Sequence, residues 1–360
     1  MIIGNFDPLK GERFQVLGEN GKANPEWEPK LSGADLQKIY ALMATTRAAD
    51  LKAFKLQRQG RMGTFAPSLG HEACQVGSAF AVQSKDWVFP YFRDLGTYVT
   101  LGLPLKHYYL YWMGNEEGMH IPENLNIFPI SVPVGSHLPH AVGCAMAMKS
   151  QKTGAAVVAY FGDGATSEGD FSESLNFAGV FQTPNVFICL NNQYAISTPV
   201  AHQTAAKTIA QKALAFGFEG IQVDGNDALA MYAAAMEALE KARSGGGPTL
   251  IEAFTYRMAN HTTSDDASRY RPETELSEWA KRDPIDRFKQ YLKAKGLWDE
   301  SFESGVQKAA DELINNAVAE AEDTPAPQPE DLFVHTYKEM PPKLAEQLAA
   351  LRGTPKEGRG

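Results

Sequence analysis

The sequence predicts an α/β fold built on a doubly wound, mainly parallel β-sheet. The first observation behind this prediction is a strand–helix–strand pattern. A continuous apolar run at 155–161 (AAVVAYF) is followed by an amphipathic stretch at 167–181 and a second apolar run at 186–190. Such runs are typical of strands buried on both faces. Ser167 with Asp170 three residues later resembles a capping box, which would begin the helix.

A second unit of the same kind follows directly along the chain. The segment 220–225 (GIQVDG) predicts a strand, and the alanine-rich stretch 227–244 predicts a helix. Three glycines and a proline at 245–248 end that helix, and a further strand is expected to run to Arg257. Repetition of the unit is the second observation that favours a parallel sheet with helices on both faces.

The remaining segments predict extensions around this sheet. Apolar residues recur at helical spacing over 34–59 and stop at Gly60, which predicts a helix. We expect an N-terminal arm at 1–33, a ligand-binding α/β domain at 34–272, and a helical C-terminal extension and tail at 273–360. The extension is expected to pack on the sheet or on a partner. Within it, TPAPQPE at 324–330 predicts a stiff connector, and the last eight residues predict a frayed tail.

Composition excludes several classes of protein. The chain has 360 residues, 44% hydrophobic and 21% charged, as in soluble globular proteins. Its net charge of −9 argues against general binding of nucleic acid. The odd, widely spaced cysteines Cys74, Cys144 and Cys189 exclude a disulfide framework and a CxxC motif, and predict core thiols of a cytosolic protein. Without a signal peptide or an apolar run near ~18 residues, we expect a cytoplasmic protein with no membrane partner.

Polar residues follow three of the predicted strands. Gly162-Asp163-Gly164 ends the first, Asn192 follows the second, and His261 lies just beyond the strand that ends at Arg257. Carboxyl ends of parallel strands share one edge of the sheet, where ligands bind. The glycines allow close backbone approach, and the following helix directs its free amides at the same point. Carboxylate, amide and carbonyl oxygens suit Mg²⁺ that also binds phosphate oxygens. The pattern therefore predicts a magnesium–diphosphate site.

The same residues also allow a structural turn, a surface ion pair, an NAD site or a serine hydrolase site. A GDG after a strand is often only a turn, and Arg93 could form a surface ion pair with Asp94. The glycines are spaced G-x-G-x4-G rather than G-x-G-x-x-G, which disfavours binding of NAD. Ser167, Asp227 and His261 follow the order of a serine hydrolase, but Ser167 lies six residues past Phe161, whereas an elbow serine stands at the strand end.

The string from Gly162 to Asn192, GDGATSEGDFSESLNFAGVFQTPNVFICLNN, resembles the thiamine-diphosphate motif. Further segments resemble the α subunit of the thiamine-diphosphate-dependent component of 2-oxoacid dehydrogenase complexes, most of all the bacterial pyruvate enzymes with separate α and β chains. These are RQGRMGTFAPSLGHEACQVG, DWVFPYFRDLGTYVTLGLPL, NNQYAISTP, IQVDGNDALAMY, GPTLIEAFTYR and HTTSDDASRYRP. The resemblance extends from about Leu36 to Glu346 and implies the thiamine-diphosphate-binding fold.

The resemblance assigns roles to individual residues. It implies that Asp163, Asn192 and the carbonyl of Tyr194 bind Mg²⁺. The remaining residues that it implies at the cofactor are Phe92, Arg93, Ser131, Val134, Gly162, Gly164, Ala165, Arg257 and His261. Phe92 stands where many relatives have Tyr, which removes a hydroxyl contact to the cofactor. Thr262 replaces the Ser that is phosphorylated in mitochondrial relatives.

The resemblance also implies an activity and partners. Such enzymes decarboxylate a 2-oxoacid and transfer the acyl group to the lipoyl group of a partner acyltransferase, and His261 would serve as acid or base because an imidazole titrates near neutrality. The glutamate that activates the cofactor would come from a β subunit, in an α2β2 heterotetramer. Pyruvate is the expected substrate, with a branched-chain 2-oxoacid or acetoin as alternatives. Phe65 is expected to help shape the substrate pocket.

Overall fold

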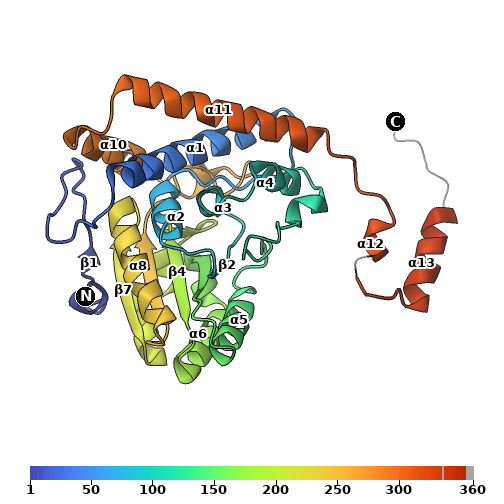
Figure 1. Cartoon of the computed structure of the whole chain (residues 1–360), viewed down its shortest axis with the longest axis horizontal. Coiled ribbons are helices and arrows are strands. Elements are labelled where there is room, and N and C mark those ends of the chain that lie inside the picture. Colours follow the sequence, from blue (N-terminus) through green and yellow to red (C-terminus); the bar gives the residue numbers. More distant parts are fainter. Residues whose placement is uncertain (335, 354–360) are drawn as a thin grey trace.

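The computed structural model describes residues 1–334 and 336–353 and confirms the α/β fold (Figure 1). Six parallel strands form one sheet in the order β1-β7-β8-β4-β3-β2. Their bounds are β1 (Arg13–Phe14), β2 (Trp87–Phe89), β3 (Val157–Gly162), β4 (Asn185–Asn191), β7 (Glu219–Asp224) and β8 (Thr249–Phe254). A short antiparallel pair, β5 (Tyr194–Ala195) and β6 (Thr198–Pro199), follows β4.

Helices surround the sheet and extend beyond it at the C-terminal end. Their bounds are α1 (Gly33–Arg58), α2 (Glu72–Ala79), α3 (Leu95–Leu101), α4 (Leu105–Trp112), α5 (Leu138–Ser150), α6 (Gly169–Phe181), α7 (Val200–Gln203), α8 (Ala228–Arg243), α9 (Glu273–Ala280), α10 (Pro284–Ala294), α11 (Glu300–Glu322), α12 (Asp331–Val334) and α13 (Pro342–Gly353). Short 3-10 helices lie at Ile3–Asn5, Glu116–Met119, Asp163–Ser167, Ala210–Phe216 and Ala267–Arg269.

Alternate residues of the central strands enter two separate hydrophobic cores. In β3, Val158 and Tyr160 pack in the core beneath α2 and α8, whereas Val157, Ala159 and Phe161 pack in the core beneath α5 and α6. All five side chains are buried. Coverage of both faces explains why these strands are continuously apolar in sequence.

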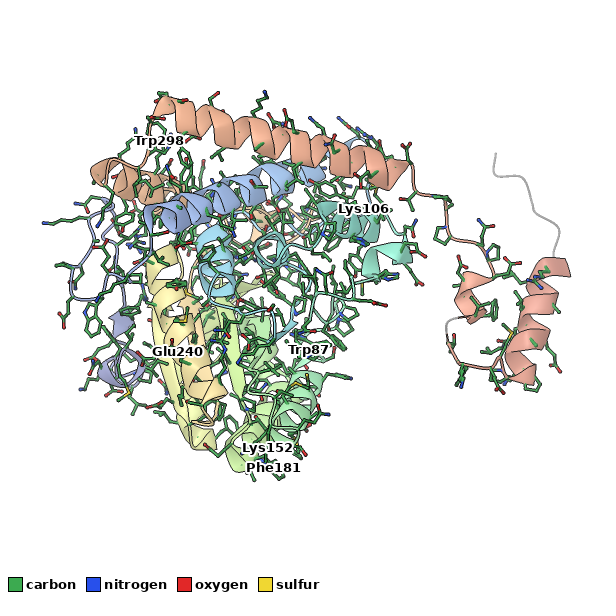
Figure 2. All side chains as sticks on the ribbon, in the orientation of Figure 1. Trp87, Lys106, Lys152, Phe181, Glu240 and Trp298 are labelled. Carbon is green, nitrogen blue, oxygen red and sulfur yellow. The ribbon has the colours of Figure 1, made fainter. Side chains whose placement is uncertain are left out.

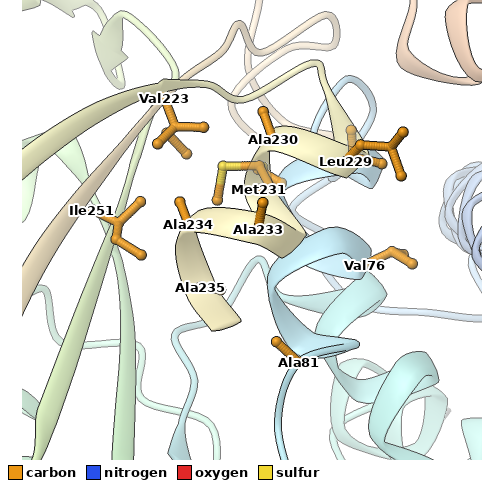
Figure 3. Close-up of a cluster of buried hydrophobic side chains, with 14 of the residues drawn as sticks. Val76, Ala81, Val223, Leu229, Ala230, Met231, Ala233, Ala234, Ala235 and Ile251 are labelled. Carbon is orange, nitrogen blue, oxygen red and sulfur yellow. The ribbon is translucent and has the colours of Figure 1, made fainter. Parts of the chain in front are cut away.

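Small residues let α2 and α8 approach one another closely over the sheet. Val76 of α2 and the alanines of α8 belong to one buried cluster, with Val223 and Ile251 of the sheet beside it (Figure 3). At Gly77, an added Cβ would lie 2.5 Å from the carbonyl oxygen of Ala228. The alanine-rich sequence of α8 therefore reflects close helix packing rather than helix propensity alone.

The N-terminal segment joins the sheet through β1, which pairs with β7 at the sheet edge. The predicted helix at 34–59 is present as α1. Ser32 and Asp35 form a capping box at its start, and Gly60 adopts a positive φ of 73° just after its end. The side chain of Asp227 caps α8 by accepting hydrogen bonds from the amides of Leu229 and Ala230.

Two local predictions at strand and helix ends are wrong. β8 ends at Phe254 instead of Arg257. The amide of Thr255 still donates to the carbonyl of Asn191 at the end of β4, but the chain then turns away, and the amide of Met258 donates to the carbonyl of Leu69. Ser167 does not cap α6. It ends a 3-10 helix instead, and Glu168 stands at the N-cap position of α6 without a side-chain cap.

The C-terminal helices α10 and α11 pack on other helices, whereas Trp279 of α9 packs against Phe254 of β8. α11 lies along α1 and α4, with Lys106 Nζ of α4 3.8 Å from Glu320 Oε2 (Figure 2). Trp298, between α10 and α11, lies under the ammonium groups of Lys289 and Lys293. Residues 324–330 form no helix or strand, and α12 and α13 stand clear of the body (Figure 1). The predicted frayed tail lies outside the described residues from 354 onward.

The cysteines are free thiols: Cys74 and Cys189 are buried and Cys144 is half-buried. Among the helices within the described ranges, none is long and apolar enough to cross a membrane.

The contact between α2 and α8 can be tested at Gly77. We expect Gly77→Ala to destabilise the fold by about 1–3 kcal/mol, the usual cost of overpacking, because its methyl group would overlap the Ala228 carbonyl. Gly305→Ala is the control: no atom lies within 4 Å of an added Cβ there, and alanine is favoured in a helix interior. Thermal unfolding of both variants measures the difference. Equal or greater stability of Gly77→Ala would contradict the packing described.

Candidate active site

A cavity of about 540 Å³ lies at the carboxyl edge of the sheet. Every residue that the sequence resemblance implies at the cofactor lines it, although these residues are spread over 170 positions from Phe92 to His261. The list is Phe92, Arg93, Ser131, Val134, Gly162, Asp163, Gly164, Ala165, Asn192, Tyr194, Arg257 and His261. The structure therefore brings all the predicted site residues together.

The loop after β3 places Asp163 at the base of the cavity. Its carboxylate accepts hydrogen bonds from Gln203 Nε2 at 2.7 Å and from the backbone amide of Asn192. Burial raises the pKa of Asp163, while these hydrogen bonds lower it. A glycine at position 164 lets the chain after β3 approach Ala195 of β5 closely, because an added Cβ would lie 2.9 Å from the Cβ of Ala195. The loop is thus compact and holds one buried carboxylate.

Two further oxygen atoms come from the chain after β4. Asn192 Oδ1 accepts from the amide of Tyr194 at 3.3 Å, and the Tyr194 carbonyl accepts from Arg257 Nη1 at 3.1 Å. Each oxygen has a second lone pair. With Asp163 they provide carboxylate, amide and carbonyl oxygens, the donor types that Mg²⁺ prefers. Within residues 1–334 and 336–353, no group of three or more His, Cys, Asp or Glu side chains could hold a metal instead.

Two arginines face the cavity without any carboxylate partner in the described chain. Arg93 donates to the carbonyls of Pro67 and His261, and Arg257 donates to the carbonyls of Tyr194 and Ile196. Each is only 1% exposed. Burial lowers the pKa of both, and Arg93 further lowers that of Arg257, to about 10. Both remain cationic at neutral pH.

The suggested ion pair between Arg93 and Asp94 does not form. Both residues are buried, and the Asp94 carboxylate accepts from the amide of Tyr91 at 2.8 Å. The Arg93 side chain turns instead toward His261. This orientation makes its positive charge available to the cavity.

His261 lies between the two arginines. Arg93 Nη2 is 3.1 Å and Arg257 Nη1 is 3.3 Å from His261 Nδ1, so two cationic donors face one ring nitrogen. Burial, followed by the charges of Arg93 and Arg257, lowers the pKa of His261 to about 3. These surroundings favour the neutral imidazole, with Nδ1 as acceptor from the two guanidinium groups.

Sequence reasoning missed several residues of the cavity wall, among them Thr64, Tyr91, Trp112 and Ile196. Thr64, Tyr91 and Ile196 lie within segments that carry the family resemblance, but no site role was assigned to them there, and Trp112 at the end of α4 lies outside those segments. The prediction for Phe65 is wrong. Its ring is fully buried against Tyr108 and Trp112, and its neighbours Thr64 and Ala66 line the cavity instead.

The hydrolase alternative is not supported by the geometry. Ser167 does not line the cavity, and Asp227 is buried at the start of α8, where its carboxylate accepts from the amides of Val16 and Leu17. Neither residue contacts His261. A Ser–His–Asp arrangement is therefore absent from these three residues.

Comparison with known proteins identifies the family. Residues 40–330 match the dehydrogenase E1 component family. The chain belongs to this family. A relative named pyruvate dehydrogenase E1 component subunit alpha, from Acholeplasma laidlawii, is 48% identical over 332 residues, covering 91% of this chain and 96% of the relative. The Bacillus cereus protein of the same name is 44% identical, covering 93% and 91%. The Mycobacterium tuberculosis 3-methyl-2-oxobutanoate dehydrogenase subunit alpha is 43% identical, covering 95% and 94%.

The E1 family is thiamine-diphosphate-dependent. The names of the three relatives describe each of them as an alpha subunit. The cavity shared by all the predicted residues is therefore the place to seek its cofactor.

The charge environment of His261 gives a testable result. We expect its imidazole to show no titration between pH 5 and 8 in the full chain, because both arginines oppose its protonation. Inorganic pyrophosphate should raise the pKa by offsetting those charges. Nuclear magnetic resonance of the imidazole nitrogens measures both, with His261→Gln identifying the signal. An ordinary titration near pH 6.5 without anion would contradict the arrangement described.

Proposed function

We propose that this chain is the α subunit of a pyruvate dehydrogenase E1 that binds the diphosphate of thiamine diphosphate together with Mg²⁺. The observation that carries the proposal is the pair of buried arginines, Arg93 and Arg257, which form no ion pair with a carboxylate of residues 1–334 and 336–353 and face a cavity containing Asp163. Buried cations normally require a counter-charge. An anion bound in the cavity would provide it.

The residues present fit such a group. Arg93, Arg257 and His261 lie on one side of the cavity, and the oxygens of Asp163, Asn192 and Tyr194 belong to the loops that follow β3 and β4. A diphosphate could contact the first set and share a divalent cation with the second. Mg²⁺ commonly binds through one or two protein oxygens together with phosphate oxygens. The absence of a Cβ at Gly164 lets the chain after β3 pack closely against Ala195, so that both residues line the cavity.

When bound, thiamine diphosphate supplies the electron sink that decarboxylation of a 2-oxoacid requires. The chain's own residues position it: Arg93 and Arg257 neutralise phosphate oxygens, and Asp163 binds the metal. A diphosphate bound beside Arg93 and Arg257 would oppose the part of the lowering of the His261 pKa that comes from those two charges. His261 would hold or release a proton at Nδ1 or Nε2 during acyl transfer.

A β subunit is proposed to complete the site. Three apolar residues of the cavity wall, Val132, Val134 and Ile196, are each about half exposed in this chain. A partner covering this wall would exclude water and supply the glutamate that activates the cofactor. We propose an α2β2 heterotetramer, because a shared site is duplicated by twofold symmetry. A lipoyl-bearing acyltransferase then accepts the acyl group, and the free thiols favour a cytoplasmic location.

Pyruvate is the proposed substrate because several relatives carry the pyruvate dehydrogenase name, including the one at 48% identity. The relative named for 3-methyl-2-oxobutanoate, at 43%, keeps a branched-chain 2-oxoacid as the second candidate. Trp112, Phe92 and Thr64 in the cavity wall provide bulk that favours a small acyl group.

Removing the carboxylate of Asp163 tests the metal assignment. We expect Asp163→Ala to abolish magnesium-dependent binding of thiamine diphosphate while the fold remains intact, since the residue lies in the short 3-10 helix after β3 and belongs to none of the hydrophobic cores. Calorimetric titration with and without Mg²⁺ measures this, with the exposed Asp266→Ala as the control. Binding within about threefold of wild type, well inside the usual tenfold-or-greater cost of losing a metal site residue, would overturn the assignment.

The requirement for a β subunit is tested by co-expression with the partner gene. We expect turnover with an artificial electron acceptor only from the co-purified pair, with pyruvate preferred over 3-methyl-2-oxobutanoate. The α chain alone should self-associate and bind the cofactor weakly, because its cavity wall is uncovered. Size-exclusion chromatography with light scattering measures assembly. A monomeric α chain with full cofactor affinity would refute the shared site, and preference for the branched acid would refute the substrate.

A further inference from the structure

Asp50 of α1 is a fully buried carboxylate, and no cation within the described chain forms an ion pair with it. It does not line the cavity. Its Oδ1 accepts two hydrogen bonds from Ser68, from the amide at 2.7 Å and from the hydroxyl at 3.1 Å. A buried charge without a partner is costly, so its place in the structure requires a reason.

The peptide group between Pro67 and Ser68 connects Asp50 to Arg93. The amide of Ser68 and the carbonyl of Pro67 belong to the same trans peptide unit, and that carbonyl accepts a hydrogen bond from Arg93 Nη1. The carboxylate of Asp50 and the guanidinium of Arg93 therefore bind opposite ends of one peptide dipole. Hydrogen bonds in such a chain polarise and strengthen one another in a medium of low dielectric constant.

We propose that Asp50 is a positioning residue for the anion site: it fixes the Pro67–Ser68 peptide, which in turn orients Arg93 and, through Arg93, His261. The carboxyl oxygen of Asp50 and the guanidinium of Arg93 hold the two ends of this peptide group by hydrogen bonds. This assignment rests on the proposed function for the identity of the anion. It gives a reason for a buried acceptor at this position that forms no ion pair with any described residue.

The surrounding contacts support this role. Neighbouring backbone of the same segment also holds the His261 loop, because the amide of Phe65 donates to Thr263 Oγ1 at 3.0 Å and the amide of Thr263 donates to the Phe65 carbonyl at 2.8 Å. Residues 65–68 therefore link α1 both to Arg93 and to the loop that carries His261.

Charged and titratable groups from several elements surround Asp50. Burial and Glu72 of α2 raise the pKa of Asp50, while Ser68 and Arg93 lower it, and the net pKa is about 7. Tyr108 and Tyr109 of α4 also face the carboxyl group. A neutral amide at this position is therefore a close mimic of one form that the carboxyl group adopts near neutral pH.

The test compares three substitutions in the co-purified α–β enzyme. Asp50→Asn keeps an oxygen that can accept from Ser68, whereas Asp50→Ala removes the acceptor, and Asp50→Leu removes it while filling the space and protecting the fold. Calorimetry with inorganic pyrophosphate and with thiamine diphosphate, both with Mg²⁺, gives the affinity. Asp227→Asn is the control, since Asp227 is equally buried and accepts backbone amides but lies away from the cavity.

We expect affinity to fall about 10- to 100-fold in Asp50→Ala and Asp50→Leu, the usual loss when an outer partner of a binding residue is removed. Asp50→Asn should restore affinity to within about threefold, far less than that loss. In Asp50→Ala and Asp50→Leu, the KM for the cofactor should rise by a larger factor than kcat falls. Wild-type affinity in folded Asp50→Leu, or equal losses in the leucine and asparagine variants, would overturn the assignment. Failure of the wild-type enzyme to bind thiamine diphosphate would instead refute the proposed function.

Discussion

The site depends on two buried guanidinium groups that form no ion pair with any carboxylate of the described residues. Arg93 and Arg257 are fixed by main-chain carbonyls, which orient the cations but do not neutralise them. Within a cavity of low dielectric constant, this leaves a strong preference for an anion. Burial and the same two charges lower the pKa of His261. Affinity, metal binding and protonation at this site are therefore coupled through the arginines.

The sheet topology explains how distant residues come to share this cavity. β3, β4 and β8 are neighbours and parallel, so the segments after them emerge at one edge. Asp163, Asn192 and Arg257 each follow one of these strands. The two hydrophobic cores hold the strands in register from both faces, so that the loops can carry polar groups without having to stabilise the fold.

The parts of this arrangement that were predictable are those encoded by local pattern. Continuous apolar runs predicted β3 and β4, and the polar residues directly after them predicted a magnesium–diphosphate site. The charges and contacts around each site residue were not predictable from the sequence. The low pKa of His261 requires knowledge that Arg93, 168 positions away, lies 3.1 Å from its ring. The inward direction of Phe65 and the role of Asp50 likewise depend on contacts that no sequence spacing reveals. The incorrect cap at Ser167 arose because a 3-10 helix intervenes before α6.

We propose that one cavity holds a diphosphate between the two arginines and a divalent cation on Asp163, Asn192 and Tyr194. A crystal structure of the co-purified α–β enzyme with thiamine diphosphate and Mn²⁺ would locate both groups, because Mn²⁺ scatters anomalously and suits the same hard oxygen ligands. We expect one anomalous peak bonded to Asp163, Asn192 Oδ1 and the Tyr194 carbonyl, with diphosphate oxygens on Arg93 and Arg257. A metal bound elsewhere, or a diphosphate that contacts neither arginine, would contradict it.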